Sequence, residues 1–459
     1  MVYWRYKMFN SIKIAYRNAF RNKRRTLLSI LAIGIGGFAS LTIGSFVNSV
    51  NQGIQTQTAR DSGHIHVHAK GYFDFGLGKV DKYTIEDYEV VMKAIRESKI
   101  GEEITVMTPV LSISGIAGHY AKNASQTFVG VGQVYTDQLQ MQAWDGYGIN
   151  MPAPQTPLRK DSTEAYIGKG LASNLNLCEK LKLEGCVEEQ IVTNSNPIDE
   201  DMNDFLEHEE VTSDAMVSLL VASSHGAPNI ANVKIAAVWA KTQKNLDDMF
   251  IALPLKEAQI LLYGEENKKA SAINIQLKSY ESMDKTIASL KTLFKEKNLD
   301  LEVIDLETFN PEVQKVIGIF GVIFGFVSII IGLIVVFTVS NTMTMSIMER
   351  FNEIGTLRSM GLRRSMIRRY FVLEGSIIGI VGATVGVVFA YVVTTAINSV
   401  GLMWSPPNTA VETQLILSMD SLALVVFVWV FLVIVSTISS LLPAIRASKM
   451  PIVDALRHN

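Results

Sequence analysis

The chain has 459 residues, of which 48% are hydrophobic, and its 42 Lys and Arg side chains nearly balance its 44 Asp and Glu side chains. This composition is typical of a membrane protein that carries a sizeable water-soluble domain. It argues against a nucleic-acid-binding protein, because the basic residues gather beside the apolar stretches.

Four apolar stretches with at most one charged residue each are long enough to cross a bilayer, which takes about 20 apolar residues. They predict spanning helices at residues 26–48, 313–348, 370–397 and 421–445. The first stretch is too long for the apolar part of a cleaved signal peptide, and no clear small-residue cleavage site follows it. We therefore expect it to remain as a membrane anchor.

The positions of Lys and Arg predict how these spans are oriented, because cytoplasmic flanks are enriched in both. They gather in residues 1–25, 349–369 and 446–459, whereas the loop 398–420 has none. We expect those three basic segments on the cytoplasmic side of the membrane, and residues 49–312 and 398–420 on the opposite side. Aromatic and aliphatic residues at helical spacing within 1–25 predict an amphipathic helix on the cytoplasmic surface.

The long segment between the first two spans, residues 49–312, shows the alternation of a soluble α+β domain, and we expect two lobes. Strands are predicted at 64–70, 104–116, 126–134, 216–223, 232–240, 249–253, 271–278 and 301–305. Helices are predicted at 50–60, 83–98, 255–263 and 283–297, and a strand entering a short helix at 166–177. Residues 188–213 are acidic and poor in apolar residues, which is typical of a long loop or an insertion.

The only two cysteines, Cys178 and Cys186, both fall in this domain. An external compartment permits a disulfide, and a bridge between them would close a small loop. Two unpaired thiols are the alternative. His64, His66 and His68 alternate, so in a strand their imidazoles share one face, which is a possible Zn or Cu site. Because no carboxylate or cysteine lies close in sequence, we predict no metal there.

The sequence contains none of the common catalytic motifs. It lacks a Gly-x-x-x-x-Gly-Lys-Ser/Thr phosphate loop, a Gly-x-Ser-x-Gly elbow and a His-Glu-x-x-His zinc motif. His225, in SSHGAPN, is interpreted as a loop residue. We therefore predict a protein that is not an enzyme and that has no cofactor of its own.

Residues 349–369 form a short amphipathic segment, rich in Arg, between two spans. Glu353, Ile354, Leu357 and Arg358 fall on neighbouring faces of one short helix, a pattern suited to binding a partner. The alternative is a basic helix at the membrane surface that binds only anionic lipid headgroups. Lipid binding alone would not need Glu349 and Glu353.

Small residues recur along two of the spans. Gly375, Gly379, Gly382 and Gly386 lie on the third, and Gly318, Gly321 and Gly325 on the second. Such spacing lets helix backbones approach closely, either within the chain or in a dimer. Glu374, at the start of the third span, is expected to pair with Arg368 or Arg369.

Several motifs, in order along the chain, resemble the MacB/LolC/FtsX-type permeases of ABC transporters. They are NAFRNKRRTLLSILAIGIG at the first span, GHIHVHAKGYFDFG after it, YIGKGLASNLNL and VWAKTQKNLDDMFIALPLKEAQILL in the large domain, ERFNEIGTLRSMGLRRSMIRRYFVLEG between spans two and three, and PAIRASKMPIVDALR at the end. The absence of a fused ATPase resembles LolC, LolE or FtsX more than MacB.

The resemblance implies a permease dimer, of one chain or of two related chains, that binds two copies of a separate ATPase and transmits its motion to the periplasmic domain. Residues 349–369 would then hold the coupling helix, with the ATPase contacts at Glu349, Glu353, Ile354, Leu357, Arg358, Met360 and Gly361. Release of a lipoprotein or other lipid-linked cargo to a periplasmic carrier is the leading expectation. The alternatives are MacB-like efflux of a peptide, toxin or small molecule with an adaptor protein, and FtsX-like regulation of a cell-wall hydrolase.

Overall fold

The computed structural model describes residues 16–17, 20–75, 83–147, 158–159, 162–183, 215–224, 226–241, 243–265, 267–305, 308, 311–404, 413–419 and 421–449. The chain divides into two compact units. The membrane unit comprises residues 1–51, 314–402 and 415–459, and the external unit comprises residues 52–313 and 403–414. Most of the predicted surface helix in 1–25, the acidic segment 188–213, Cys186 and His225 lie outside the described residues.

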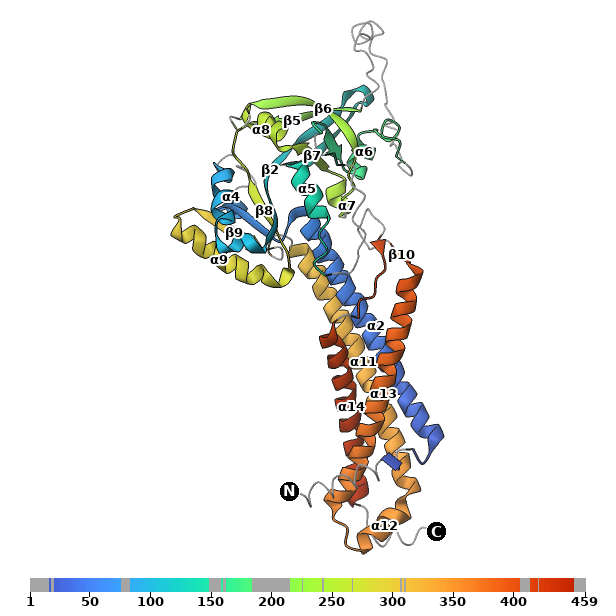
Figure 1. Ribbon diagram of the computed structural model, residues 1–459. Helices are drawn as coiled ribbons and strands as arrows, with labels where there is room; N and C mark the ends of the chain where they lie inside the picture. Colours follow the sequence, from blue (N-terminus) through green and yellow to red (C-terminus); the bar gives the residue numbers. More distant parts are fainter. Residues whose placement is uncertain are drawn as a thin grey trace. The chain divides into compact units, whose positions relative to one another are not determined.

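The membrane unit is built on four long apolar helices (Figure 1). They are α2 (Lys23–Ser62), α11 (Pro311–Glu349), α13 (Arg364–Val400) and α14 (Leu422–Lys449). The helix α2 has 40 residues, which at 1.5 Å per residue is about 60 Å long, twice the apolar thickness of a bilayer. Its last residues, from Gln52, therefore belong to the external unit.

Glycines let the helices of the membrane unit pack closely. A Cβ atom at Gly375 would lie 2.4 Å from the Cβ of Ser440, and one at Gly379 would lie 2.7 Å from the Cβ of Ser436. A Cβ at Gly386 would lie 2.8 Å from the carbonyl oxygen of Gly34. Only glycine leaves room for these contacts, which join α13 to α14 and to α2.

The external unit contains a mixed sheet in the order β3-β7-β4-β6-β5-β2-β8-β1-β9. Because β3 also pairs with β2, the six strands from β3 to β2 close into a ring. The ring strands are β2 (Ile104–His119), β3 (Ala124–Gln133), β4 (Ala165–Ile167), β5 (Met216–Ala222), β6 (Pro228–Val238) and β7 (Phe250–Pro254). The strands β8 (Ala272–Leu277), β1 (Ile65–Ala69) and β9 (Leu301–Asp305) extend the sheet beyond the ring.

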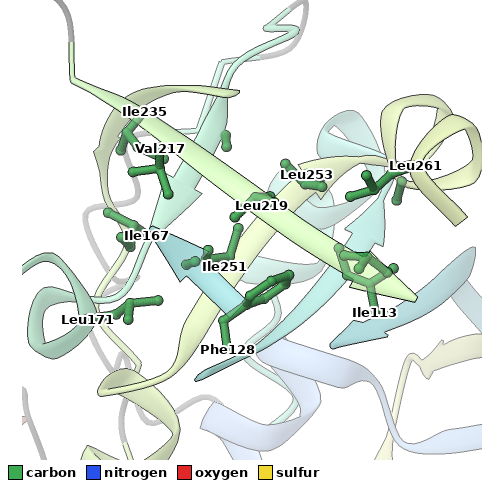
Figure 2. Packing of buried hydrophobic residues seen from close by; sticks show 14 of the residues in the cluster. Ile113, Phe128, Ile167, Leu171, Val217, Leu219, Ile235, Ile251, Leu253 and Leu261 are labelled. Carbon is green, nitrogen blue, oxygen red and sulfur yellow. The ribbon is translucent and has the colours of Figure 1, made fainter. Parts of the chain in front are cut away.

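The long strand β2 joins two hydrophobic cores. Its first half pairs with β8 and its second half with β5. One core fills the ring, where Phe128, Leu219 and Ile251 converge (Figure 2). The other core lies between the β8-β1-β9 extension and the helices α4 (Tyr88–Arg96) and α9 (Met283–Glu296). Two α+β lobes were expected; the structure has two hydrophobic cores, and the strand β2 contributes to both.

Hydrogen bonds to the side chain of Asp247 connect two of the sequence motifs, YIGKGLASNLNL and VWAKTQKNLDDMFIALPLKEAQILL. The Asp247 carboxylate, from the short helix α7 (Lys244–Asp247), accepts hydrogen bonds from the backbone N–H groups of Lys169, Gly170 and Lys241 at 2.7 to 3.2 Å. The first two N–H groups open the helix α6 (Lys169–Asn174). A Cβ at Gly170 would lie 1.9 Å from the Asp248 carboxylate, so this approach requires glycine.

Most of the predicted elements of the external unit are observed, with α8 (Leu255–Tyr263) and β9 at the predicted residues. The helix α5 (Tyr135–Gln142) was not predicted. Its buried face is formed by Tyr135, Gln138, Met141 and Gln142. Because two of these four are glutamines, the helix has no hydrophobic periodicity to detect.

The remaining elements are short. They are α3 (Tyr72–Phe75), the 3-10 helices η2 (Lys99–Glu103), η3 (Tyr120–Lys122) and η5 (Tyr280–Ser282), and the two-residue strands β10 (Met403–Trp404) and β11 (Thr413–Gln414). The last two pair with each other between α13 and α14.

Candidate functional site

The segment between α11 and α13 folds as the short helix α12 (Phe351–Ser359), at one end of the bundle (Figure 1). Gly361 ends the turn after it with φ of +91°, a conformation that costs glycine nothing and that L side chains rarely adopt. The N–H of Gly361 bonds to the carbonyl of Arg358, and the N–H of Leu362 bonds to that of Leu357. The elbow is therefore a defined structure with a glycine at its C-terminal turn.

One face of α12 packs against the bundle. Ile354 is 5% exposed and lies in an apolar cluster with Ile347 of α11, Ile367 and Phe371 of α13, and Ala444 and Ala447 of α14. This placement corrects the expectation that Ile354 contacts an ATPase, because its side chain is already covered by its own chain. Ile354 instead packs α12 against α11, α13 and α14.

Two apolar side chains beside this packed face are open to solvent. Leu357 is 41% exposed and Met360 is 71% exposed. An exposed leucine beside an exposed methionine at the end of a helix is an apolar surface that a partner can cover. Among the apolar residues predicted to contact a partner, the structure leaves these two available.

The two predicted acidic contacts are paired within the chain. Arg21 Nη1 lies 2.7 Å from Glu353 Oε1, and Arg25 binds Glu349. Asn22 donates a weaker hydrogen bond to Glu349 at 3.5 Å. The start of α2 and the residues just before it therefore form ion pairs with the end of α11 and with α12. From the sequence, these arginines were expected only to set membrane orientation.

Glu374 is 4% exposed and binds Arg350, not Arg368 or Arg369 as expected. The distance from Arg350 Nη1 to Glu374 Oε2 is 3.4 Å, and Ser346 donates to the other oxygen at 3.3 Å. Residues five and six apart on a helix point in different directions, which places Arg368 and Arg369 away from Glu374. Both of those arginines are exposed.

The glycine residues fall into two groups with different surroundings. Gly375, Gly379, Gly382 and Gly386 all face other helices of the same chain. By contrast, a Cβ added at Gly318, Gly321 or Gly325 of α11 would meet nothing within 4 Å in the described structure. The first group therefore serves packing within the chain, and the second leaves an open small-residue face on α11.

The C-terminal end of α2 is held in the external unit by buried polar contacts. Gln138 of α5 donates to the carbonyl of Arg60 at 2.9 Å, and Gln276 of β8 donates to the carbonyl of Ala59 at 2.9 Å. The side chain of Arg60, 2% exposed, donates to the carbonyl of Trp144 at 2.8 Å. The bond from Gln138 satisfies a carbonyl group of the last turn of α2, whereas the Ala59 carbonyl also accepts from the N–H of Gly63.

Lys241 adds a charged contact to the same joint. Its ammonium group lies 3.9 Å from the Asp61 carboxylate and 3.4 Å from the centre of the Trp239 ring. Burial lowers the pKa of Lys241, while Asp61 and Asp247 act in the opposite direction. The end of α2 is therefore fixed to the external unit by hydrogen bonds and by an ion pair.

The histidines and the cysteine considered as possible sites are buried within the external unit. His64, His66 and His68 are at most 3% exposed, and each Nδ1 atom bonds to a protein group. Within the described residues, no group of three His, Cys, Asp or Glu side chains is arranged to hold a metal ion. Cys178 is buried and disulfide-bonded. Since Cys186 lies outside the described residues, the bridge between them stays a prediction.

Comparisons with known proteins agree with this architecture. Residues 26–293 match the family model of the MacB-like periplasmic core domain, and residues 316–452 match that of the FtsX-like permease C-terminal domain. All of this chain aligns with the macrolide export ATP-binding/permease protein MacB of Vibrio parahaemolyticus at 20% identity. The alignment covers 61% of that protein. The chain is also similar to the ABC transporter permease YtrF of Bacillus subtilis (35% identity over 30% of this chain and 32% of that protein).

A third relative is the lipoprotein-releasing system transmembrane protein LolC of Haemophilus influenzae, 29% identical over 28% of this chain and 33% of that protein. The chain thus spans between about a third and three fifths of the length of these relatives. Among solved structures, the periplasmic region of MacB from Actinobacillus actinomycetemcomitans gives a TM-score of 0.29 at 13% identity, over 56% of this chain and 96% of that one. The first family model covers more than half of the chain, which therefore belongs to the MacB/LolC/FtsX-type family of ABC transporter permeases.

Proposed function

We propose that this chain is the permease subunit that connects a separate cytoplasmic ATPase to an external domain. In this proposal, two permease subunits bind two ATPase subunits, and ATP-driven motion enters each permease through α12. The observation that carries the proposal is the exposure of two apolar side chains, Leu357 in α12 and Met360 directly after it, beside Ile354, which is packed against the bundle.

The path of this motion would run along α2. Arg21 and Arg25 join the start of α2 to Glu353 and Glu349 at the elbow. The same helix continues without a break to Ser62, where Gln138 and Gln276 hold its last turn. A helix fixed at both ends can carry a displacement of one end to the other, since its backbone hydrogen bonds resist extension.

The leading cargo in this proposal is a lipoprotein or another lipid-linked molecule, released from the outer leaflet of the inner membrane. Similarity to LolC supports it. A second candidate is MacB-like efflux of a peptide, toxin or small molecule with a periplasmic adaptor. The alignment with MacB over the whole chain favours this second candidate. Mass spectrometry of molecules that co-purify with the complex distinguishes a lipid-linked cargo from a soluble one.

The coupling role is tested with Leu357→Asp. The substitution places an unpaired charge in an apolar contact, which costs several kcal/mol and removes most of the ATPase from the complex. We expect Arg358→Ala to weaken binding less, because it removes one polar contact and buries no charge. The measurement is recovery of the ATPase by each tagged permease variant from membranes that contain both subunits.

Ser365→Asp is the matched control, since it adds the same charge at an exposed position of α13 outside α12. If the elbow binds only lipid headgroups, Leu357→Asp and the control recover equal amounts of ATPase. Equal and full recovery contradicts the proposal.

A further inference from the structure

The strand β8 connects the last turn of α2 to the end of α5 through one buried side chain. Gln276 of β8 is 0% exposed, and its Nε2 donates hydrogen bonds to the Ala59 carbonyl at 2.9 Å and to the Met141 carbonyl at 2.8 Å. An amide nitrogen has two hydrogens, so both are used by these bonds. The amide group of Gln276 therefore lies between the two helices.

Four buried polar atoms beside this contact have no hydrogen-bond partner among the described residues. They are Gln276 Oε1, both atoms of the Gln142 amide and the Thr56 hydroxyl. Gln142 directly follows Met141 on α5 and is 2% exposed, and Thr56 precedes Ala59 by about one helical turn and is 0% exposed. Bulk solvent therefore does not reach these groups, and the described chain does not satisfy them.

The end of α5 and the residues after it run alongside α2 in the opposite direction. Gln138 donates to the Arg60 carbonyl, and Tyr147, further along the chain, donates to the Gln55 side chain, which comes earlier in α2. Gln142 lies between these two contacts, so it is placed beside the turn of α2 that precedes Arg60. That turn carries the unpartnered hydroxyl, so both helices and the amide of β8 contribute to one buried polar region.

The unpartnered atoms include both donors and acceptors. The Gln142 amide offers two N–H groups and an oxygen, the Thr56 hydroxyl can donate and accept, and Gln276 contributes an oxygen that only accepts. A buried amide or hydroxyl without a hydrogen bond destabilises the folded state. Water both donates and accepts, and a buried water molecule makes about three hydrogen bonds to such groups. A cation would leave the N–H donors unsatisfied, and an anion would be repelled by the oxygens, so water fits this set best.

We propose that ordered water is bound between α2, α5 and β8, where it joins the Gln142 amide, the Thr56 hydroxyl and Gln276 Oε1. The bound water adds a water-mediated contact to the direct hydrogen bonds that Gln138 and Gln276 make with the end of α2. The proposal concerns residues of the external unit alone and does not depend on the coupling role.

A double-mutant cycle on the full-length protein in detergent tests this water. The variants are Thr56→Val, which replaces the hydroxyl by a methyl group, Gln142→Leu, which removes the amide, and the double change. The readout is hydrogen exchange of residues 52–62, which reports how often the end of α2 opens. Each single change should raise the opening equilibrium about tenfold, because it removes a bond to the water and weakens its hold on the remaining groups.

The double change should raise opening about tenfold less than the product of the two single effects, because both side chains bind the same water. The matched control combines Gln142→Leu with Thr286→Val. Thr286 is 4% exposed, and its hydroxyl donates to the Ser282 carbonyl at the start of α9. In the control pair the two effects should multiply to within about twofold.

A dry cavity predicts the opposite sign, because removal of an unsatisfied amide stabilises the fold, so slower opening in Gln142→Leu overturns the proposal. Single effects that multiply in the double variant overturn the shared water. A crystal structure of the unchanged full-length protein gives a readout that does not depend on the variants. We expect electron density for water about 2.7 to 3.2 Å from the Gln142 amide, and an amide that contacts only protein atoms contradicts the proposal.

Discussion

Three of the buried histidines of the external unit, His64, His66 and His68, show how a polar residue is accommodated at the scale of a single side chain. His66 Nδ1 lies 2.9 Å from the amide oxygen of Asn274, and the ring of His68 stacks on Tyr72 with centroids 4.5 Å apart. Burial lowers the pKa of His64 and His66 to about 4 and that of His68 to about 3. At neutral pH all three are therefore uncharged members of the sheet.

These lowered pKa values predict that acid destabilises the external unit. Below pH 6.5 the unfolded chain takes up protons that the folded chain excludes, so stability is full above that pH and is lost as the pH falls toward 4. Each histidine contributes a slope of about 1.4 kcal/mol per pH unit in this range. The measurement is the urea midpoint of the detergent-solubilised chain at several pH values between 7.5 and 4.5.

His68→Phe keeps the stacked ring but removes one of these three titrating groups, so the part of the pH dependence that the three contribute should fall by about a third. A midpoint that is independent of pH in both proteins contradicts the buried, neutral state of the histidines.

The glycines of α13 predict a steric effect at single positions. A Cβ at Gly379 would lie 2.7 Å from the Cβ of Ser436, whereas one at Gly321 meets nothing within 4 Å in the described structure. Gly379→Leu should therefore lower stability by about 1 to 3 kcal/mol through overpacking. Gly321→Leu is the control of equal size in a spanning helix. Thermal unfolding of the two variants in detergent should separate them, and equal midpoints would mean that α13 and α14 do not pack as described.

At the scale of elements, the sequence predicted the helices and strands whose residues repeat with a clear period. The helix α8 is an example, because its buried residues recur at helical spacing. The long spans were equally clear from their apolar length. The helix α5 was missed because glutamines occupy half of its buried face.

The contacts of the elbow could be predicted only in part. An amphipathic helix at 349–369 followed from its pattern, but the pairs Arg21–Glu353 and Arg25–Glu349 join residues more than 300 positions apart. No local pattern indicates such pairs, since positive charge beside a span is expected for orientation alone. The burial of Ile354 was missed for the same reason, because the cluster that covers it comes from three other helices.

The hydrogen bond from Gln138 to the Arg60 carbonyl predicts that the helix α5 stabilises the last turn of α2. Gln138→Leu removes the donor that satisfies the Arg60 carbonyl, which should cost about 1 to 3 kcal/mol because that carbonyl is left without its bond. Gln140→Leu is the control on the same helix, since Gln140 is exposed. Hydrogen exchange of residues 52–62 should rise in the first variant and not in the second. Unchanged exchange in both would show that Gln138 does not hold the joint.

At the scale of the whole molecule, one helix belongs to both units. The beginning of α2 contributes to the elbow contacts, and its end is held by hydrogen bonds from β8 and α5. A second connection leads from β9 toward α11, and residues 403–414 join the external unit between α13 and α14. Residues 52–313 of the external unit are therefore an insertion between two spanning helices, α2 and α11.

The orientation of the chain is the last prediction, and it rests on the Lys and Arg asymmetry across the four spans. The helix α14 ends with Arg446 and Lys449, and the start of α13 contains Arg364, Arg368 and Arg369, whereas the loop 398–420 contains no Lys or Arg. Positive flanks stay in the cytoplasm. We therefore expect residue 122, in the external unit, outside the inner membrane, and residue 365 inside.

Single cysteines test this orientation after Cys178 and Cys186 have been replaced. Lys122→Cys is preferred to a change at the neighbouring Asn123, whose φ of +50° disfavours most side chains. Both Lys122 and Ser365 are exposed, so a cysteine at either position is accessible to a reagent on its own side. A membrane-impermeant maleimide should label the Lys122→Cys variant in cells with a permeabilised outer membrane, and the Ser365→Cys variant only after the inner membrane is disrupted. Labelling of the Ser365→Cys variant in cells with an intact inner membrane would place α12 outside the cytoplasm, where no ATPase can reach it.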